Sequence, residues 1–170
     1  MPKDKIPLKT VKQFPYKTLN RLINKAKNYI KKDKVWADIC EEYDEDVDII
    51  DIIPTMFGDL EVSASTQHGI VILNYKLLCD GDFFEDFSYL IHEYRHWFQQ
   101  CYGDGPTISS ADGEYLDNPF EQEAFQNQVE YIDEQFGKDE AEDYVDKLLD
   151  HHDVDGKKKD NLEDVLMGKI

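Results

Sequence analysis

The residues with the clearest chemical potential lie in the segment His92-Glu93-Tyr94-Arg95-His96, which fits the pattern HExxH. Two histidines at positions i and i+4 of a helix project from one face, one turn apart, so both imidazoles can bind one tetrahedral metal ion. A glutamate beside the first histidine can accept a proton from a metal-bound water and pass it to a leaving amine. The segment therefore predicts that His92 and His96 bind Zn²⁺ and that Glu93 is the catalytic base of a hydrolase.

The spacing of apolar residues predicts that this segment lies on a helix from about Phe84 to Cys101. At about 100° per residue, His92 and His96 are separated by about 40° around the helix. Six apolar residues occupy the opposite side: Phe87, Leu90, Tyr94, Trp97, Phe98 and Cys101. We expect that side to face a core and the histidine face to lie elsewhere. A pair of buried structural histidines is the alternative, but that role requires no glutamate between them.

A catalytic zinc site needs a third protein ligand and one open position. A second helix is expected from Pro119 to Phe136, closed by Gly137, and it offers Glu121 and Glu123. Helical phase places Glu121 on the same face as the apolar residues Phe125, Val129, Ile132 and Phe136, and it places Glu123 on the solvent side. A carboxylate on a core face needs compensation, which a metal supplies. Glu121 is therefore the predicted third ligand.

Two alternatives to this assignment remain. Either Glu123 or Asp117 could supply the third ligand instead. Glu121 could also have a structural role, because Asn118 followed three residues later by a glutamate fits a capping box at the start of a helix. The first alternative changes the ligand set, whereas the second removes the carboxylate from it.

The loop from Gly103 to Asp117 connects the two ligand-bearing helices and is rich in small and turn-forming residues. We expect it to lie at the mouth of the cleft, where it could act as a lid. Its acids would favour basic peptides; they are Asp104, Asp112, Glu114 and Asp117. Tyr115 could donate a hydrogen bond to the oxyanion of the transition state, and simple packing is the alternative for this side chain.

Other elements must hold these helices in place. Helices are also expected at about Tyr16–Lys32, Val35–Cys40 and Asp139–Leu149, and a polar tail follows the last of these. Strand-forming residues occur in three segments, Val47–Ile53, Leu60–Ser65 and Ile70–Asn74. Four turn-like residues join the last two segments and predict a hairpin. The predicted fold class is α+β and zincin-like, with a small, mostly antiparallel sheet packed on the HExxH helix and a following ligand helix.

The chain has 170 residues, which suits a single domain. Within it we expect a basic helical segment (1–43), a catalytic core (44–137) and a C-terminal helix with a polar tail (138–170). The net charge is −18, although residues 1–34 contain eleven Lys or Arg and only two acids. An acidic body repels nucleic acid. The basic segment could contact an anionic partner or fold back on the acidic body, and we favour the second because opposite charges on one chain attract.

Cysteine content and hydropathy bear on the compartment. The three cysteines form no framework spacing, which favours free thiols in a reducing compartment. The N-terminus lacks the apolar core of a signal peptide, and no apolar run approaches the length of a membrane span. We therefore expect a cytoplasmic protein without membrane contact. The sequence makes no prediction of the oligomeric state.

These motifs resemble the gluzincins, HExxH peptidases whose third ligand is a glutamate on a later helix. Twenty-four residues separate His96 from Glu121, which suits that group. The segment Gly69–Asn74 resembles the strand that borders the substrate cleft in such folds, and Pro119–Ala124 is similar to helix starts of small phage-type and bacterial metallopeptidases. The resemblance covers about residues 57–136 and implies an intracellular or phage-encoded zinc peptidase with a peptide or protein substrate.

The chain departs from the thermolysin pattern around the third ligand. Asn118 is separated from Glu121, so the Asn-Glu dipeptide is missing, and Phe125 stands where an aspartate would follow. A different function class also remains open, namely a zinc-stabilised, catalytically inactive binding or phage–host interaction protein. The presence of Glu93 and the lack of a fourth protein ligand favour the enzyme, because structural zinc sites close their coordination sphere.

Overall fold

The computed structural model describes residues 5–81, 83, 85–103 and 115–168. It divides into two compact units, Met1–Ile108 and Ser109–Ile170, called here the N-terminal and C-terminal units. The described residues form an α+β structure in which helices dominate and the strands belong to one small sheet of the N-terminal unit. The α+β class is therefore confirmed, and the single domain stays a prediction.

The N-terminal unit begins with three helices, α1 (Leu8–Val11), α2 (Tyr16–Lys31) and α3 (Lys34–Glu42). Helices α2 and α3 lie at nearly the predicted positions, whereas α1 was not predicted. Helix α2 buries Ile23, Ala26 and Ile30, whose spacing is that of an amphipathic helix packed against a core. Asp33 separates α2 from α3 because its side chain caps α3, accepting a hydrogen bond from the Val35 amide at 2.7 Å.

The strand expected at Val47–Ile53 is wrong. Residues Val47–Ile52 form a 3₁₀ helix, η1. The Asp46 carboxylate accepts a hydrogen bond from the Asp48 amide at 2.9 Å and starts this helix. Its three-residue period places Ile50 and Ile53 in the core and exposes Ile52. A local cap and a period of three therefore override the strand propensity of Val and Ile.

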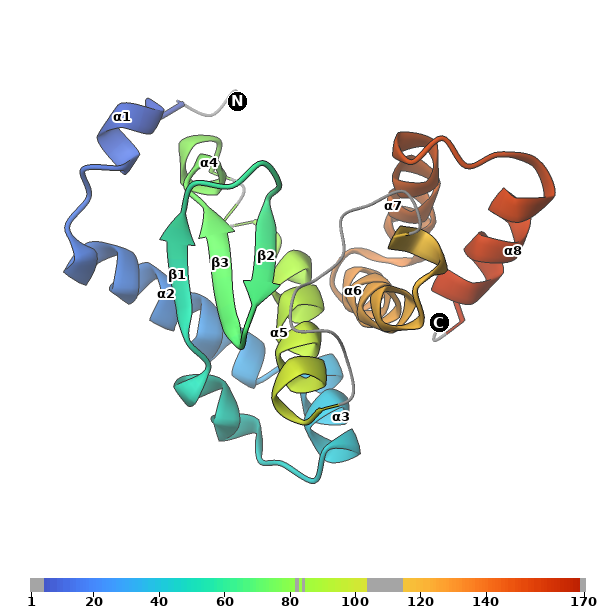
Figure 1. Ribbon diagram of the computed structural model, residues 1–170, viewed down its shortest axis with the longest axis horizontal. Helices are drawn as coiled ribbons and strands as arrows, with labels where there is room; N and C mark the ends of the chain where they lie inside the picture. Colours follow the sequence, from blue (N-terminus) through green and yellow to red (C-terminus); the bar gives the residue numbers. More distant parts are fainter. Residues whose placement is uncertain (1–4, 82, 84, 104–114, 169–170) are drawn as a thin grey trace. The chain divides into compact units, whose positions relative to one another are not determined.

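The sheet has three strands, β1 (Thr55–Gly58), β2 (Ala64–Gln67) and β3 (Ile70–Asn74), in the order β1-β3-β2 (Figure 1). Strands β2 and β3 form the predicted antiparallel hairpin. Strand β1 pairs with β3 in parallel, so the sheet is mixed rather than mostly antiparallel.

Strand β2 starts later than the predicted Leu60. The Asn74 side-chain amide donates hydrogen bonds of 2.9 Å to the carbonyls of Leu60 and Val62, which holds that segment as a loop. The hairpin turn consists of His68 and Gly69, whose φ angles of 51° and 77° fit a two-residue turn with two left-handed residues.

Two helices follow the sheet, α4 (Lys76–Cys79) and α5 (Ser88–Cys101). Helix α5 carries the HExxH segment and starts four residues later than predicted. The Asp86 carboxylate sets this start by accepting hydrogen bonds from the Ser88 amide at 2.8 Å and the Ser88 hydroxyl at 3.0 Å. Figure 1 shows α5 beside β2, and hydrogen bonds from Thr66 and Gln100 join the two elements.

The C-terminal unit contains η3 (Tyr115–Asp117), α6 (Pro119–Phe136), α7 (Lys138–His151) and α8 (Gly156–Leu166). Helix α6 has the predicted bounds. Asn118 caps it by accepting a hydrogen bond from the Phe120 amide at 2.9 Å, and Gly137 ends it with a φ of 99°.

Helix α8 lies in the segment predicted as a polar tail. Two of its residues, Leu162 and Leu166, are buried in the same core cluster as Phe125, Val129 and Ile132 of α6. The predicted burial of Phe136 is wrong, because this last residue of α6 is 49% exposed. Over the described part of the chain, no helix is both long and apolar enough to cross a membrane.

Candidate metal centre

His92 and His96 occupy consecutive turns of α5, with 5% and 2% of their surfaces exposed. Their Nε2 atoms lie 3.2 Å apart. Two nitrogens bound to one tetrahedral zinc at about 2.0–2.1 Å would be separated by about 3.3 Å. The histidine pair therefore has the spacing of two ligands of one ion. A direct Nε2–H···Nε2 hydrogen bond also fits this distance in the absence of metal.

Gln99 fixes the orientation of the second histidine. Its Oε1 atom lies 2.7 Å from His96 Nδ1. A carbonyl oxygen can only accept, so Nδ1 carries the proton and Nε2 presents its lone pair. Metal-binding histidines commonly donate their other N–H in this way, and the bond sets both tautomer and ring orientation. Sequence reasoning missed this role, although the three-residue spacing from His96 on a helix was an available signal.

Glu93 is buried beside the histidine pair, and its two carboxylate oxygens have different surroundings. Oε1 accepts a hydrogen bond of 3.0 Å from the Thr66 hydroxyl of β2. Oε2 lies 3.9 Å from His92 Nε2. One oxygen is thus anchored to the sheet while the other lies next to a candidate ligand atom. This arrangement suits a base that receives a proton from a water bound near His92.

The two central residues of the HExxH segment, Tyr94 and Arg95, contact other elements of the N-terminal unit. The Tyr94 hydroxyl lies 3.0 Å from Thr55 Oγ1 of β1, and burial raises the pKa of Tyr94. Arg95 forms an ion pair of 2.7 Å with Glu42 and lies over the ring of Tyr43, 5.4 Å from its centroid. These contacts join α5 to β1 and to the C-terminal end of α3.

The expectation that α5 buries only its apolar side is wrong. Every residue from Leu90 to Gln99 is buried, including His92, Glu93 and His96, whereas Cys101 is exposed. The hydrophobic pattern could not reveal this burial, because the polar side chains are accommodated by hydrogen bonds to Thr66 and Gln99.

Glu121 has the burial expected from helical phase, with 1% of its surface exposed on α6. Glu123 is only partly buried. Asp117 is exposed, and its carboxylate forms an ion pair of 3.1 Å with Lys158. Of the three carboxylates considered from the sequence, Glu121 is the one removed from water.

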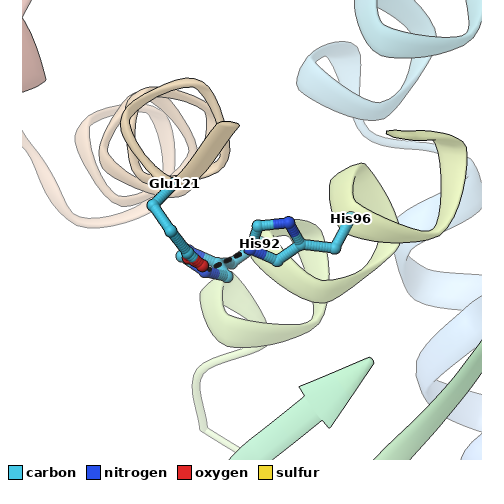
Figure 2. A group of neighbouring side chains, drawn as sticks. All are labelled: His92, His96 and Glu121. Carbon is cyan, nitrogen blue, oxygen red and sulfur yellow. Dashed lines mark hydrogen bonds between the residues drawn. The ribbon is translucent and has the colours of Figure 1, made fainter. Parts of the chain in front are cut away.

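His92, His96 and Glu121 are all buried, and each offers one atom that could bind a metal ion, the two histidines from the N-terminal unit and Glu121 from the C-terminal unit. Figure 2 shows the two imidazoles on α5 and the Glu121 carboxylate on α6. Two imidazole nitrogens and one carboxylate oxygen form a donor set that suits Zn²⁺.

Other predicted features of the site lie outside the described residues. They include residues 104–114 of the lid and the side chain of Tyr115, whose backbone starts η3.

The basic N-terminal segment folds back on its own unit in part. Three of its lysines pair with acids that follow along the chain, in the pairs Lys5–Asp80, Lys12–Asp59 and Lys31–Asp51 at 3.5, 2.6 and 2.7 Å. These ion pairs agree with the favoured prediction, in which the basic segment folds back on the acidic body of the chain.

Comparisons with protein-family models, with curated proteins and with solved structures found no match to this chain.

Proposed function

We propose that the protein is a zinc-dependent peptidase in which His92, His96 and Glu121 bind the metal and Glu93 activates the attacking water. The observation that carries this proposal is the pair of imidazole Nε2 atoms 3.2 Å apart, with a carboxylate oxygen of Glu93 3.9 Å from one of them. Two buried histidines with a purely structural role would not require the adjacent carboxylate of Glu93.

The donor set supports zinc and a catalytic rather than a structural site. Among the residues that the structure describes, two imidazoles and one carboxylate supply three protein ligands, which leaves a fourth position for water. Structural zinc sites have four protein ligands. A cation bound by the buried Glu121 carboxylate would offset part of the cost of removing that group from water.

A bound zinc ion would lower the pKa of its water and polarise the carbonyl of the peptide bond. The chain's own residues would carry out the proton transfers. Glu93 Oε2 accepts the proton that leaves the water as the water oxygen attacks the carbonyl carbon. The same oxygen then gives that proton to the amide nitrogen as the C–N bond breaks. Gln99 keeps the proton of His96 on Nδ1, so that Nε2 stays available as a ligand.

A zinc-stabilised binding protein is the second candidate, and the deep burial of His92, Glu93 and His96 favours it. The two functions differ in the role of Glu93. In a peptidase this residue must accept a proton, whereas a structural site needs only its shape and hydrogen bonds.

The Glu93→Gln variant separates these functions. Glutamine has nearly the same shape but cannot accept the proton, so we expect full zinc content and a loss of peptide hydrolysis of at least about 100-fold. Glu61→Gln is the matched control, because it makes the same change of charge at an exposed position. Undiminished hydrolysis by Glu93→Gln would place the base elsewhere, and the lack of peptide hydrolysis by the zinc-loaded parent would favour the binding protein.

A further inference from the structure

We propose that Thr66 is a positioning residue for catalysis, which holds one oxygen of Glu93 so that the other faces the reacting water. This inference rests on the proposed function and adds to it a residue of β2 that no motif identifies. Among the residues proposed to take part in the reaction, Thr66 contacts Glu93, so it acts through the base.

The contact is buried, and the Thr66 hydroxyl lies within hydrogen-bond distance of two oxygens of Glu93. Thr66 has 0% of its surface exposed. Its hydroxyl lies 3.0 Å from Glu93 Oε1 and 3.0 Å from the backbone carbonyl oxygen of Glu93. A hydroxyl has one proton, so these two acceptors share it. A charged carboxylate is the stronger acceptor, and the hydrogen bond to Oε1 is therefore the dominant one.

Thr66 is itself held against α5 by Gln100. The Gln100 side chain donates a hydrogen bond of 2.8 Å to the Thr66 carbonyl and accepts one of 2.8 Å from the Gly69 amide. Gln100 lies seven residues after Glu93, about two helical turns, and therefore on the same face of α5. Two side chains of one helix face thus hold the end of β2, and they determine where the Thr66 hydroxyl lies.

This arrangement divides the two oxygens of the base between two tasks. Oε1 is occupied by the Thr66 hydroxyl, while Oε2 lies 3.9 Å from His92 Nε2 on the side where water would be activated. Without the hydroxyl, the carboxylate can rotate about its terminal bond, and a misplacement of about 1 Å at a reacting group can lower the rate by about 100-fold.

The test compares Thr66→Val, which removes the donor at nearly constant shape, with Thr66→Ser, which keeps it. For Thr66→Val we expect kcat to fall by about 10- to 100-fold with KM and zinc affinity nearly unchanged. Thr66→Ser should restore kcat to within about threefold of the parent, because the hydroxyl is the group that acts. Thr66→Ala removes the same donor and replaces Thr66→Val in this comparison if the valine variant does not fold.

Thr55→Val is the matched control. Thr55 is also a sheet threonine whose hydroxyl contacts a side chain of α5, namely Tyr94 at 3.0 Å, but it has no contact with the base. We expect its kcat to stay near that of the parent. Equal losses in Thr66→Val and Thr55→Val, or equal losses in Thr66→Ser and Thr66→Val, would overturn the positioning role.

A second readout does not depend on turnover. In protein loaded with Co²⁺, the visible spectrum reports the surroundings of the open coordination position. We expect Thr66→Val and Glu93→Gln to shift this spectrum in the same direction, and Thr66→Ser and Thr55→Val to match the parent. A parent that cleaves no peptide would contradict the proposed function alone. A Thr66→Val spectrum identical to that of the parent would contradict the role of Thr66.

Discussion

His96 Nε2 and His92 Nε2 face each other at 3.2 Å across one turn of α5, while Gln99 accepts the proton on the far nitrogen of His96. The lone pair of His96 Nε2 is therefore directed at its neighbour. A metal ion between the two nitrogens would use that lone pair. In metal-free protein, His92 Nε2–H would donate to it. The same side-chain arrangement thus serves both states, and zinc can enter without a change in the His96 tautomer.

Replacing Gln99 tests this orientation. Gln99→Ala removes the acceptor of the His96 Nδ1 proton, so we expect zinc affinity to fall by about 10- to 100-fold, the usual cost of losing an outer-shell partner. Gln99→Glu keeps an acceptor and should recover most of the affinity. Competition with a chromophoric chelator measures both variants, and the exposed Gln13→Ala is the control. An unchanged affinity in Gln99→Ala would show that the ring is oriented by other contacts.

The third ligand is tested by a pair of neighbouring carboxylates. Glu121→Ala removes a proposed ligand. Losing an outer-shell residue lowers zinc affinity by about 10- to 100-fold, and we expect a larger loss for this variant. Glu123→Ala removes the same group from a partly buried position on the same helix turn and should bind zinc like the parent. Chelator competition ranks the two, and the reverse ranking would assign the ligand to Glu123.

Helix α6 shows what local signals can predict. Its start at Pro119 and its end at Phe136 were both correct, because Asn118, Pro119 and Gly137 act within one turn of the helix ends. The same locality explains the error at η1, where the Asp46 cap opposes the strand propensity of residues 47–53. The exposure of Phe136 shows where predictions from helical phase fail. The last residue of a helix can extend beyond the core even when it lies on the same face as the buried residues.

The candidate site could be predicted only where its residues are close in sequence. His92, Glu93 and His96 share one helix, so their types and spacing carry the prediction. Thr66 lies 27 residues before Glu93, in a segment interpreted as a turn. Its contact depends on the register of β2 against β3 and on the hydrogen bonds of Gln100. Such a contact between distant segments leaves no periodic pattern in the sequence.

The hairpin turn provides a prediction about stability. Gly69 has a φ of 77°, and a Cβ added there would lie 3.2 Å from Cys101 Sγ. Gly103 has a similar φ of 79° with nothing within 4 Å, so Gly103→Ala measures the backbone strain alone. We expect that strain to be about 1–2 kcal/mol in the free energy of unfolding.

Gly69→Ala should destabilise the protein more than Gly103→Ala, because it adds crowding and disturbs the hydrogen bond from the Gly69 amide to Gln100. Urea unfolding measures both variants. Gly69→Ala should also lower kcat, because the Gln100 side chain is hydrogen-bonded to both Gly69 and Thr66. Equal stabilities of the two alanine variants would mean that the turn is not fixed against α5.

The zinc content of the purified protein and of its histidine variants tests the central claim most directly. Metal analysis by mass spectrometry should find one zinc per chain in the parent and in His151→Ala, a control at an exposed histidine of α7. Neither His92→Ala nor His96→Ala should retain zinc after dialysis, because each loses one of three proposed ligands. Stoichiometric zinc in both of these variants, or none in the parent after zinc is supplied, would contradict the assignment of the metal centre.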